Sequence, residues 1–257
     1  MPEAGRAGLS TALRFLTILP LPGKAEVPEE VLGRSTAWFP LAGALIGAIL
    51  AGAGALAGLL WGPPTVRVLV VVGWAALTRG LHLDGLADSA DGLLGGSGRE
   101  KRLAIMKDSR IGTFGLLAVV GMLALKLAFL AELEALETTA LWRLLVPACA
   151  LARWAMLLAI FAFPTAVPGG LAGSFKRRCR WPQLGIGTLV AAAVSFFFLG
   201  VWGVSLLGLL AAATLLWSLG VRRALGGHTG DTYGALCEAG EVLVLAALST
   251  LGRFGLV

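Results

Sequence analysis

Long apolar runs separated by short polar breaks are the main pattern of this chain. A helix needs about 20 apolar residues to cross a hydrocarbon core of about 30 Å, and several runs reach that length. The predicted transmembrane segments are 36–61, 65–83, 111–131, 139–163, 184–201, 204–221, and from after Gly230 towards Phe254. In the region 184–221, one broken or re-entrant element is an alternative to the two predicted helices.

A shorter apolar run lies near the N-terminus, at 9–19. It is too short to span a membrane and is followed by Pro20 and Pro22, so it predicts a helix at the membrane interface. Of the whole chain, 57% is hydrophobic and 14% is charged, which is typical of polytopic membrane proteins. We predict one all-α domain over 1–257, an integral membrane bundle of about seven transmembrane helices plus the interfacial helix.

The positions of Lys and Arg predict the orientation of the bundle. Basic residues concentrate in 84–110, in 164–183 and at Arg222–Arg223, whereas the alternate connections 62–64 and 132–138 contain none. Because cytoplasmic loops carry an excess of Lys and Arg, we expect the three basic segments on the cytoplasmic side. The basic residues thus indicate a lipid bilayer as partner, and no nucleic acid.

Three aspartates stand out in the first basic segment, within HLDGLADSADGLLGG at 82–96. If this stretch is helical, Asp84, Asp88 and Asp91 fall within a sector of about 60°. Like charges about 6 Å apart repel by about 3 kcal/mol per pair at an effective dielectric constant of about 20. The three could be one solvated face of a loop helix, but their place at a membrane boundary favours a bound cation.

A second acidic group lies in GGHTGDTYGALCEAGE at 226–241. Asp231, Glu238 and Glu241 fall within about 80° on a helix that continues into an apolar run. Acidic residues at membrane depth are rare and by default mark a function. Together the six carboxylates, without a zinc-type set of Cys and His, predict a site for Mg²⁺, with Mn²⁺ as the alternative. Two such ions could clamp a pyrophosphate.

Candidate phosphate ligands lie in RLAIMKDSRIGTFG at 102–115 and in the glycine-rich turn before Asp231. On a helix, Lys107 and Arg110 would be neighbours. A glycine-rich turn before a helix exposes backbone N–H groups suited to phosphate. The candidate substrate-binding residues in these two stretches are Lys107, Asp108, Ser109, Arg110, Gly227, His228 and Thr229.

Three basic residues lie inside predicted spans. Arg153 is well inside its span and needs a partner, so we expect it to bind a substrate phosphate or to pair with the acidic site. Lys126 and Arg143 lie near span ends, where their charges can reach the interface, and we expect structural roles for both. His82 and His228 could each act as a base or hydrogen-bond to the backbone.

Four blocks of this sequence closely resemble the cobalamin synthase family, the adenosylcobinamide-GDP ribazoletransferases of late cobamide synthesis. The resemblance covers almost the full chain, and KDSRIGTFG and TGDxYGA are highly specific for the family. The blocks, in order, are RFLTILPLP at 14–22, HLDGLADSADGLLGG at 82–96, IMKDSRIGTFG at 105–115 and GGHTGDTYGALCEAGE at 226–241.

This resemblance implies an Mg²⁺-dependent, multi-pass enzyme of the bacterial inner membrane whose active site faces the cytoplasm. It implies transfer of adenosylcobinamide phosphate from adenosylcobinamide-GDP to α-ribazole or α-ribazole 5′-phosphate, with release of GMP. Such a transfer depends mainly on positioning and on neutralisation of charge.

The residues expected to carry this reaction divide by role. Neutralisation of phosphate oxygens is expected from Lys107, Arg110 and Arg153. The proton of the attacking hydroxyl is expected to pass to His82 or to a carboxylate. The carboxylates expected to bind metal, or in the case of the glutamates to complete or tune the site, are Asp84, Asp88, Asp91, Asp231, Glu238 and Glu241.

Two other functions fit parts of this pattern. CDP-alcohol phosphotransferases also use boundary aspartates and a divalent metal, but their DGxxAR signature requires an Arg that this chain lacks after Asp84. A cation transporter could use intramembrane carboxylates, but it would place them near the midplane, often in inverted repeats, and no repeat is found. Whether the chain forms a homo-oligomer is left open.

Overall fold

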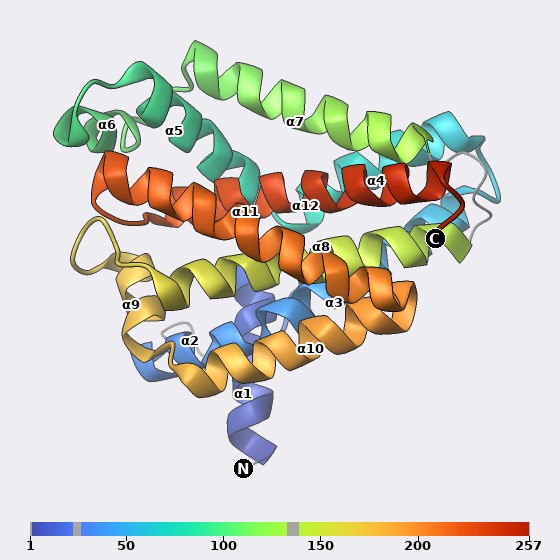
Figure 1. Cartoon of the computed structure of the whole chain (residues 1–257), viewed down its shortest axis with the longest axis horizontal. Coiled ribbons are helices and arrows are strands. Elements are labelled where there is room, and N and C mark those ends of the chain that lie inside the picture. The colour runs from blue at the N-terminus through green and yellow to red at the C-terminus, as the bar shows by residue number, and fades with distance from the viewer. Residues whose placement is uncertain (1, 23–26, 133–138, 257) are drawn as a thin grey trace.

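The computed structural model describes residues 2–22, 27–132 and 139–256, and these residues form helices joined by short connections (Figure 1). The predicted all-α fold is therefore confirmed. The helices are α1 (Pro2–Leu16), α2 (Glu29–Ser35), the 3-10 turn η1 (Thr36–Trp38), α3 (Phe39–Ala57), α4 (Pro63–Leu77), α5 (Leu81–Gly95), α6 (Arg99–Ile105), α7 (Thr113–Glu132), α8 (Thr139–Ala162), α9 (Gly170–Arg178), α10 (Trp181–Leu199), α11 (Val201–Leu225) and α12 (Gly230–Arg253).

Six helical segments in the described residues are long and apolar enough to cross a membrane, and α4 with α5 makes a seventh if the bent pair is one span. The six are the continuous segment through α2 and α3, and α7, α8, α10, α11 and α12. Helix α8 is almost wholly buried, whereas α7 and α10 are mostly exposed. Helix α8 is thus the centre of the bundle, with α7 and α10 at its periphery (Figure 1).

The predicted second span, 65–83, is wrong at its C-terminal end. Helix α4 ends at Leu77, and α5 starts at Leu81 after a bend of 84°. Arg79 and Gly80 make the break, because their φ angles of 55° and 64° are left-handed, a conformation that ends a helix. The polar stretch that begins at residue 84 is consequently helical as far as Gly95, and α6 follows after a short connection.

Residues 184–221 form two helices, so the alternative of one broken element is wrong. The chain turns between α10 and α11 at Gly200, whose φ is 58°. A Cβ on Gly203 would lie only 2.2 Å from Ser195 O, so the two helices approach closely where glycine has no side chain. Further differences are small. Helix α1 starts earlier than the predicted 9–19, α9 lies in the predicted connection 164–183, and α2 precedes the predicted span 36–61.

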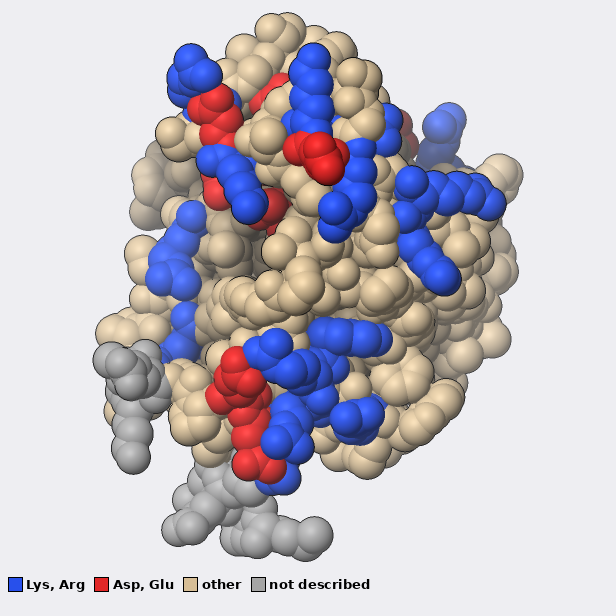
Figure 2. Space-filling model, turned by 90° about the vertical axis from the view of Figure 1, so that its left-hand side faces the viewer, with Lys and Arg blue, Asp and Glu red and all other residues tan. Residues whose placement is uncertain are grey.

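The three basic segments meet at one end of the bundle, as the charge pattern predicts, and Figure 2 shows Lys and Arg spread over that end. Arg99 at the start of α6 donates hydrogen bonds to Leu225 O at the end of α11, at 2.8 Å, and to Ala166 O between α8 and α9, at 2.6 Å. We call this end, formed by α6, the α6–α7 connection, α9 and the end of α11, the basic end.

Helices α5 and α12 pack against each other through glycines. A Cβ on Gly85 would lie 2.8 Å from Asp231 O, and a Cβ on Gly234 would lie 3.2 Å from His82 O. Small residues let helix backbones approach closely in a membrane protein. This contact brings the aspartates of α5 beside the N-terminus of α12.

Gly85→Ala is expected to disrupt this packing, because the added methyl would meet the backbone of α12, which cannot turn aside as a side chain can. The midpoint of thermal unfolding of the detergent-solubilised protein should fall. The matched control is Gly121→Ala on α7, where nothing lies within 4 Å of an added Cβ. That variant should unfold no earlier, since Ala favours a helix over Gly by about 1 kcal/mol. Equal midpoints for the two variants would contradict the close contact.

Candidate functional site

Asp84 and Asp88 on α5 and Asp231 at the start of α12 form what we call the acidic face. Asp84 is exposed, and Asp88 and Asp231 are half-buried. Asp88 is acted on by the negative charges of Asp231 and of both other aspartates of α5, so these carboxylates lie near one another. In the described part of the chain, neither Asp84 nor Asp88 has an ion-pair partner. Their mutual repulsion is thus left for a ligand to offset.

Asp91 has a different environment from the other aspartates of α5. It is buried, and its two oxygens accept hydrogen bonds from Gly112 N and Gly115 N at 2.7 and 2.9 Å. These groups lie at the start of α7, where backbone N–H groups lack partners within the helix and negative charge is favoured. The structure therefore gives Asp91 the role of anchoring α7, and both of its oxygens are already engaged.

The structure does not bring Glu238 and Glu241 to the acidic face, contrary to expectation. At about 1.5 Å per residue they lie about 10 and 15 Å beyond Asp231 along α12, and both are buried in the bundle. Lys126 Nζ donates to Glu238 Oε2 at 2.7 Å and to Glu241 Oε2 at 2.5 Å. Because a protein cation already neutralises them, these contacts give no support to a metal-ligand role for either glutamate.

Glu241 is the centre of a larger buried network. Its Oε1 accepts hydrogen bonds from Arg153 Nη1 and, at 3.1 Å, from Trp74 Nε1. Arg153 Nη2 also lies 3.3 Å from His82 Nδ1. Of the two roles expected for Arg153, pairing with an acidic residue is the one observed. Its side chain is fully buried and does not face a surface that could receive a substrate phosphate.

Lys126 does not reach the membrane interface, so that expectation is wrong. The residue is 2% exposed, and its ammonium lies 4.3 Å from the ring centroid of Trp74. A lone cation at this depth is costly, whereas Lys126 and Arg153 together balance the two glutamates. A Lys inside one apolar run and acidic residues inside another were the sequence signal for this pairing.

The whole network joins five helices and includes residues on both sides of the α4–α5 break. Trp74 and His82 stand on either side of that break, and both bond to the cluster around Glu241, so the network holds the two helices at their bend. His82 is 1% exposed and faces this network rather than the acidic face, which does not support its role as the base. The members are Trp74, His82, Lys126, Arg153, Glu238 and Glu241.

The KDSR stretch forms the exposed connection between α6 and α7. Arg110 pairs with Asp108 at 2.7 Å, and its hydrogen bonds lower the pKa of Asp108 to about 2, so the pair is ionised at neutral pH. Lys107 and Ser109 are exposed beside it. All four candidate residues are thus accessible at the basic end, where an anionic substrate can meet the two cations.

Gly227 and His228, two of the three candidate positions in the glycine-rich turn before α12, are buried. Gly227 lies where a Cβ would come within 2.5 Å of Pro164 O. His228 is buried, and burial with the charge of Lys176 lowers its pKa to about 4, so it is neutral at pH 7 and adds no charge for phosphate. Thr229 caps α12 and donates to Asp231 Oδ2 at 3.2 Å, which orients that carboxylate.

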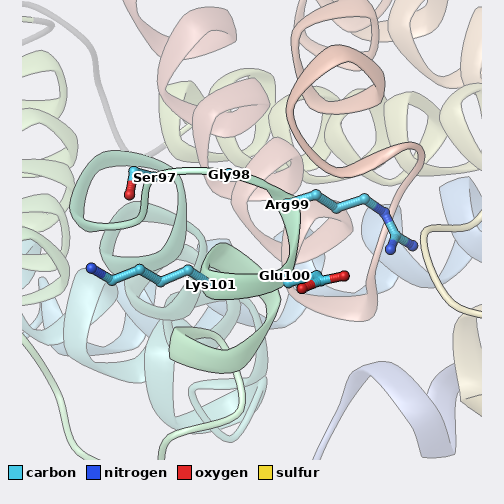
Figure 3. Close-up of a pocket in the computed structure, with 5 residues that line it drawn as sticks. All are labelled: Ser97, Gly98, Arg99, Glu100 and Lys101. Carbon is cyan, nitrogen blue, oxygen red and sulfur yellow. The ribbon is translucent and has the colours of Figure 1, made fainter.

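Two hollows open near these residues. One, of about 560 Å³, lies beside Asp84, between α5, the α4–α5 break and α7. The other, of about 410 Å³, follows residues 97–101 at the start of α6. Figure 3 shows that Arg99 and Lys101 point to opposite sides of this second hollow. Its charged groups therefore do not converge on one ligand, whereas the first hollow includes a member of the acidic face.

One or two of Asp84, Asp88 and Asp231 could hold a divalent cation, but not all three together. Among the described residues, no three His, Cys, Asp or Glu side chains converge into a complete metal site. Mg²⁺ is usually held by one or two carboxylates together with substrate phosphates rather than by a cage of protein ligands. The donors of the acidic face, hard oxygens with no cation paired to the two on α5, fit Mg²⁺ or Mn²⁺ in that manner.

Comparison with known proteins decides the family. A family model described as cobalamin-5-phosphate synthase matches residues 8–249. The chain belongs to this family. The adenosylcobinamide-GDP ribazoletransferase of Herpetosiphon aurantiacus is 45% identical over 95% of this chain and 96% of its own length. The proteins of the same name from Roseiflexus sp. and Chlorobaculum tepidum are 44% and 40% identical, over 95% and 96% of this chain and 89% and 98% of their own. No solved structure matches the chain significantly.

The resemblance found in four sequence blocks is thus confirmed, and all four lie within the matched region. As a member of the cobalamin-5-phosphate synthase family, the chain is a transferase of cobalamin synthesis with several helices that can span a membrane. The block at 82–96 forms α5, the block at 105–115 forms the α6–α7 connection, and the block at 226–241 forms the start of α12.

Lys126→Met should destabilise the protein strongly, because it leaves two buried carboxylates without their shared ammonium. Loss of one partner of a buried ion pair costs about 3–5 kcal/mol. The double variant Lys126→Met/Glu238→Gln should recover part of this loss in the free energy of unfolding, measured in detergent as a double-mutant cycle. Arg34→Ala breaks an exposed pair with Glu30 on α2 and, as the control, should change stability by less than about 1 kcal/mol. Strictly additive effects at Lys126 and Glu238 would contradict the network.

Proposed function

We propose that this protein transfers adenosylcobinamide phosphate from adenosylcobinamide-GDP to α-ribazole or α-ribazole 5′-phosphate and releases GMP. Its family and the name that its relatives bear support this choice of substrates. The observation that carries the chemistry is the acidic face, in which Asp84 and Asp88 lie unpaired beside Asp231, with Lys107 and Arg110 at the same end of the bundle. The acidic face alone would also fit a CDP-alcohol phosphotransferase or a cation transporter, and the family match is what favours the present choice.

The proposed reaction forms one P–O bond and breaks another. A ribose hydroxyl oxygen of the acceptor attacks the phosphorus that is attached to cobinamide. The bond from this phosphorus to the bridging oxygen of the diphosphate breaks, and GMP leaves with that oxygen. The proton of the hydroxyl passes to a carboxylate of the acidic face. Positioning and charge neutralisation are the main demands of such a transfer, and both fall on side chains at the basic end.

The acidic face is where we assign Mg²⁺, with Mn²⁺ as the alternative. Held by one or two of the carboxylates of Asp84, Asp88 and Asp231, the ion would neutralise charge on the diphosphate oxygens. The hydrogen bond from Thr229 fixes the carboxylate of Asp231. Lys107 and Arg110 lie exposed in the α6–α7 connection, and we assign them to the negative charge of the departing GMP.

The basic end is where the donor and the acceptor would arrive. By the positive-inside rule, we assign this end to the cytoplasmic side of a bacterial inner membrane. The opposite end, at the α3–α4 connection, then faces outwards. This orientation gives water-soluble substrates direct access to the acidic face.

Asp88→Asn should reduce GMP release at least about 100-fold, because the amide keeps the shape of the side chain but not the charge that offsets a metal ion. Purified protein would be incubated with adenosylcobinamide-GDP, each acceptor and Mg²⁺, and the cobalamin product and GMP followed by mass spectrometry. Glu100→Gln, an exposed position on α6, is the control and should turn over normally. Near-normal turnover of Asp88→Asn would remove the proposed metal site. If the unaltered protein forms no cobalamin product but moves cations across proteoliposomes, a transporter function would replace this proposal.

The orientation can be measured by labelling introduced cysteines, because the native Cys149, Cys179 and Cys237 are all buried. Ser97→Cys, at the basic end, should react with a membrane-impermeant maleimide in inside-out vesicles but not in intact spheroplasts. Trp61→Cys, at the opposite end and 50% exposed in the native protein, should show the reverse. Labelling of both positions from the same side would contradict the assigned topology.

A further inference from the structure

The groove beside Asp84 has the chemistry of a binding site. Its volume is about 560 Å³, within the range of clefts that hold small organic ligands. Aliphatic side chains supply most of its wall, and Arg79 and Asp84 are the ionisable residues among those described around it. It therefore suits a ligand that is apolar over most of its surface and carries one negative group. The lining residues are Arg79, Gly80, Leu81, Leu83, Asp84, Ala87, Ile111 and Val119.

Arg79 occupies an unfavourable backbone conformation. Its φ of 55° is left-handed, and among the described residues it is the one non-glycine residue with a positive φ. Glycine would adopt this conformation freely, and strained residues of this kind cluster at ligand sites. Its guanidinium donates one hydrogen bond, from Nη2 to Phe15 O at 3.3 Å, at an exposed position. Because a guanidinium has five N–H donors, it retains donors for an anion.

We propose that this groove binds the acceptor, a riboside with an apolar bicyclic base, and that Arg79 binds the acceptor's 5′-phosphate. The inference rests on the proposed function and assigns a place to one of its two substrates. The base lies against Leu81, Leu83 and Val119, and the sugar lies beside Asp84. In this position the attacking hydroxyl meets the acidic face, because Asp84 belongs both to the groove and to that face.

The donor does not fit this groove as well as the acceptor does. A corrinoid joined to a nucleotide diphosphate is far larger than a nucleoside, and its diphosphate needs more than one cation. Lys107 and Arg110 offer two cations, and they lie in the α6–α7 connection outside the groove. A lipid chain would pack against the apolar wall of the groove, but it would give the charges of Arg79 and Asp84 no partner. The mixed lining favours the phosphorylated riboside.

Arg79→Gly tests the phosphate contact without straining the backbone, since glycine adopts the left-handed conformation more easily than arginine does. Binding of α-ribazole 5′-phosphate alone would be measured by calorimetry, and KM would be measured for both acceptors. We expect the Kd for α-ribazole 5′-phosphate to rise about tenfold, and the ratio of KM for α-ribazole to KM for its 5′-phosphate to fall by a similar factor. Arg79→Lys keeps the charge but not the planar fork, so its Kd for α-ribazole 5′-phosphate should lie between those of the unaltered protein and Arg79→Gly.

A second pair of variants tests the apolar wall. Val119→Trp fills the groove and should weaken binding of both acceptors, whereas Val120→Trp, 55% exposed on the same helix and outside the groove, is the matched control and should not. An unchanged ratio of KM values in Arg79→Gly together with unchanged binding in Val119→Trp would overturn the proposal. So would a loss of bound lipid, rather than of acceptor binding, in Val119→Trp. Because the binding measurement needs no turnover, it separates failure of this site from failure of the proposed reaction.

Discussion

Glu241 is the buried charge that connects the helices around the α4–α5 break. A buried carboxylate is costly unless it is paired, and Glu241 is met by Arg153, Lys126 and Trp74. These three come from α8, α7 and α4, so one negative charge on α12 ties four helices together. Lipid tails are as apolar as leucine, so apolar contacts alone would discriminate little between arrangements of these helices. The network supplies directional contacts that distinguish one arrangement from the rest.

The bend that this network holds is what creates the acidic face. An unbroken helix from α4 would carry Asp84 and Asp88 onward along the same axis. Instead the chain turns by 84°, and α5 crosses α12 where Gly85 and Gly234 allow their backbones to meet. The crossing point lies next to the first turn of α12, so Asp231 joins the aspartates of α5. The position of the acidic face thus depends on interactions more than two helical turns away along α12.

Most of the helices could be predicted from apolar runs, because the thickness of a bilayer fixes the length of a span. The break at Arg79 could not, since a left-handed arginine has no signature in hydrophobic periodicity and Gly80 alone is unremarkable in a membrane helix. The anchoring role of Asp91 was hidden for a related reason. Its partners are backbone N–H groups at Gly112 and Gly115. Residue types along the sequence do not indicate that the first turn of another helix will lie beside Asp91.

The carboxylates of α12 show most clearly what the spacing of residues along one helix cannot predict. Asp231 and Glu238 share a face of α12, and their spacing made them look like members of one site. That spacing fixes their angle around the axis but leaves them about 10 Å apart along it. The environments of Glu238 and Glu241 are decided by Lys126, which is 112 residues from Glu238 in sequence, and by Arg153, which is 88 residues from Glu241. Once Lys126 and Arg153 are known to pair with the two glutamates, the carboxylates that have no paired cation can be recognised. A cation is attracted to carboxylates that the protein itself has not neutralised, and in this part of the fold Asp84 and Asp88 are such carboxylates.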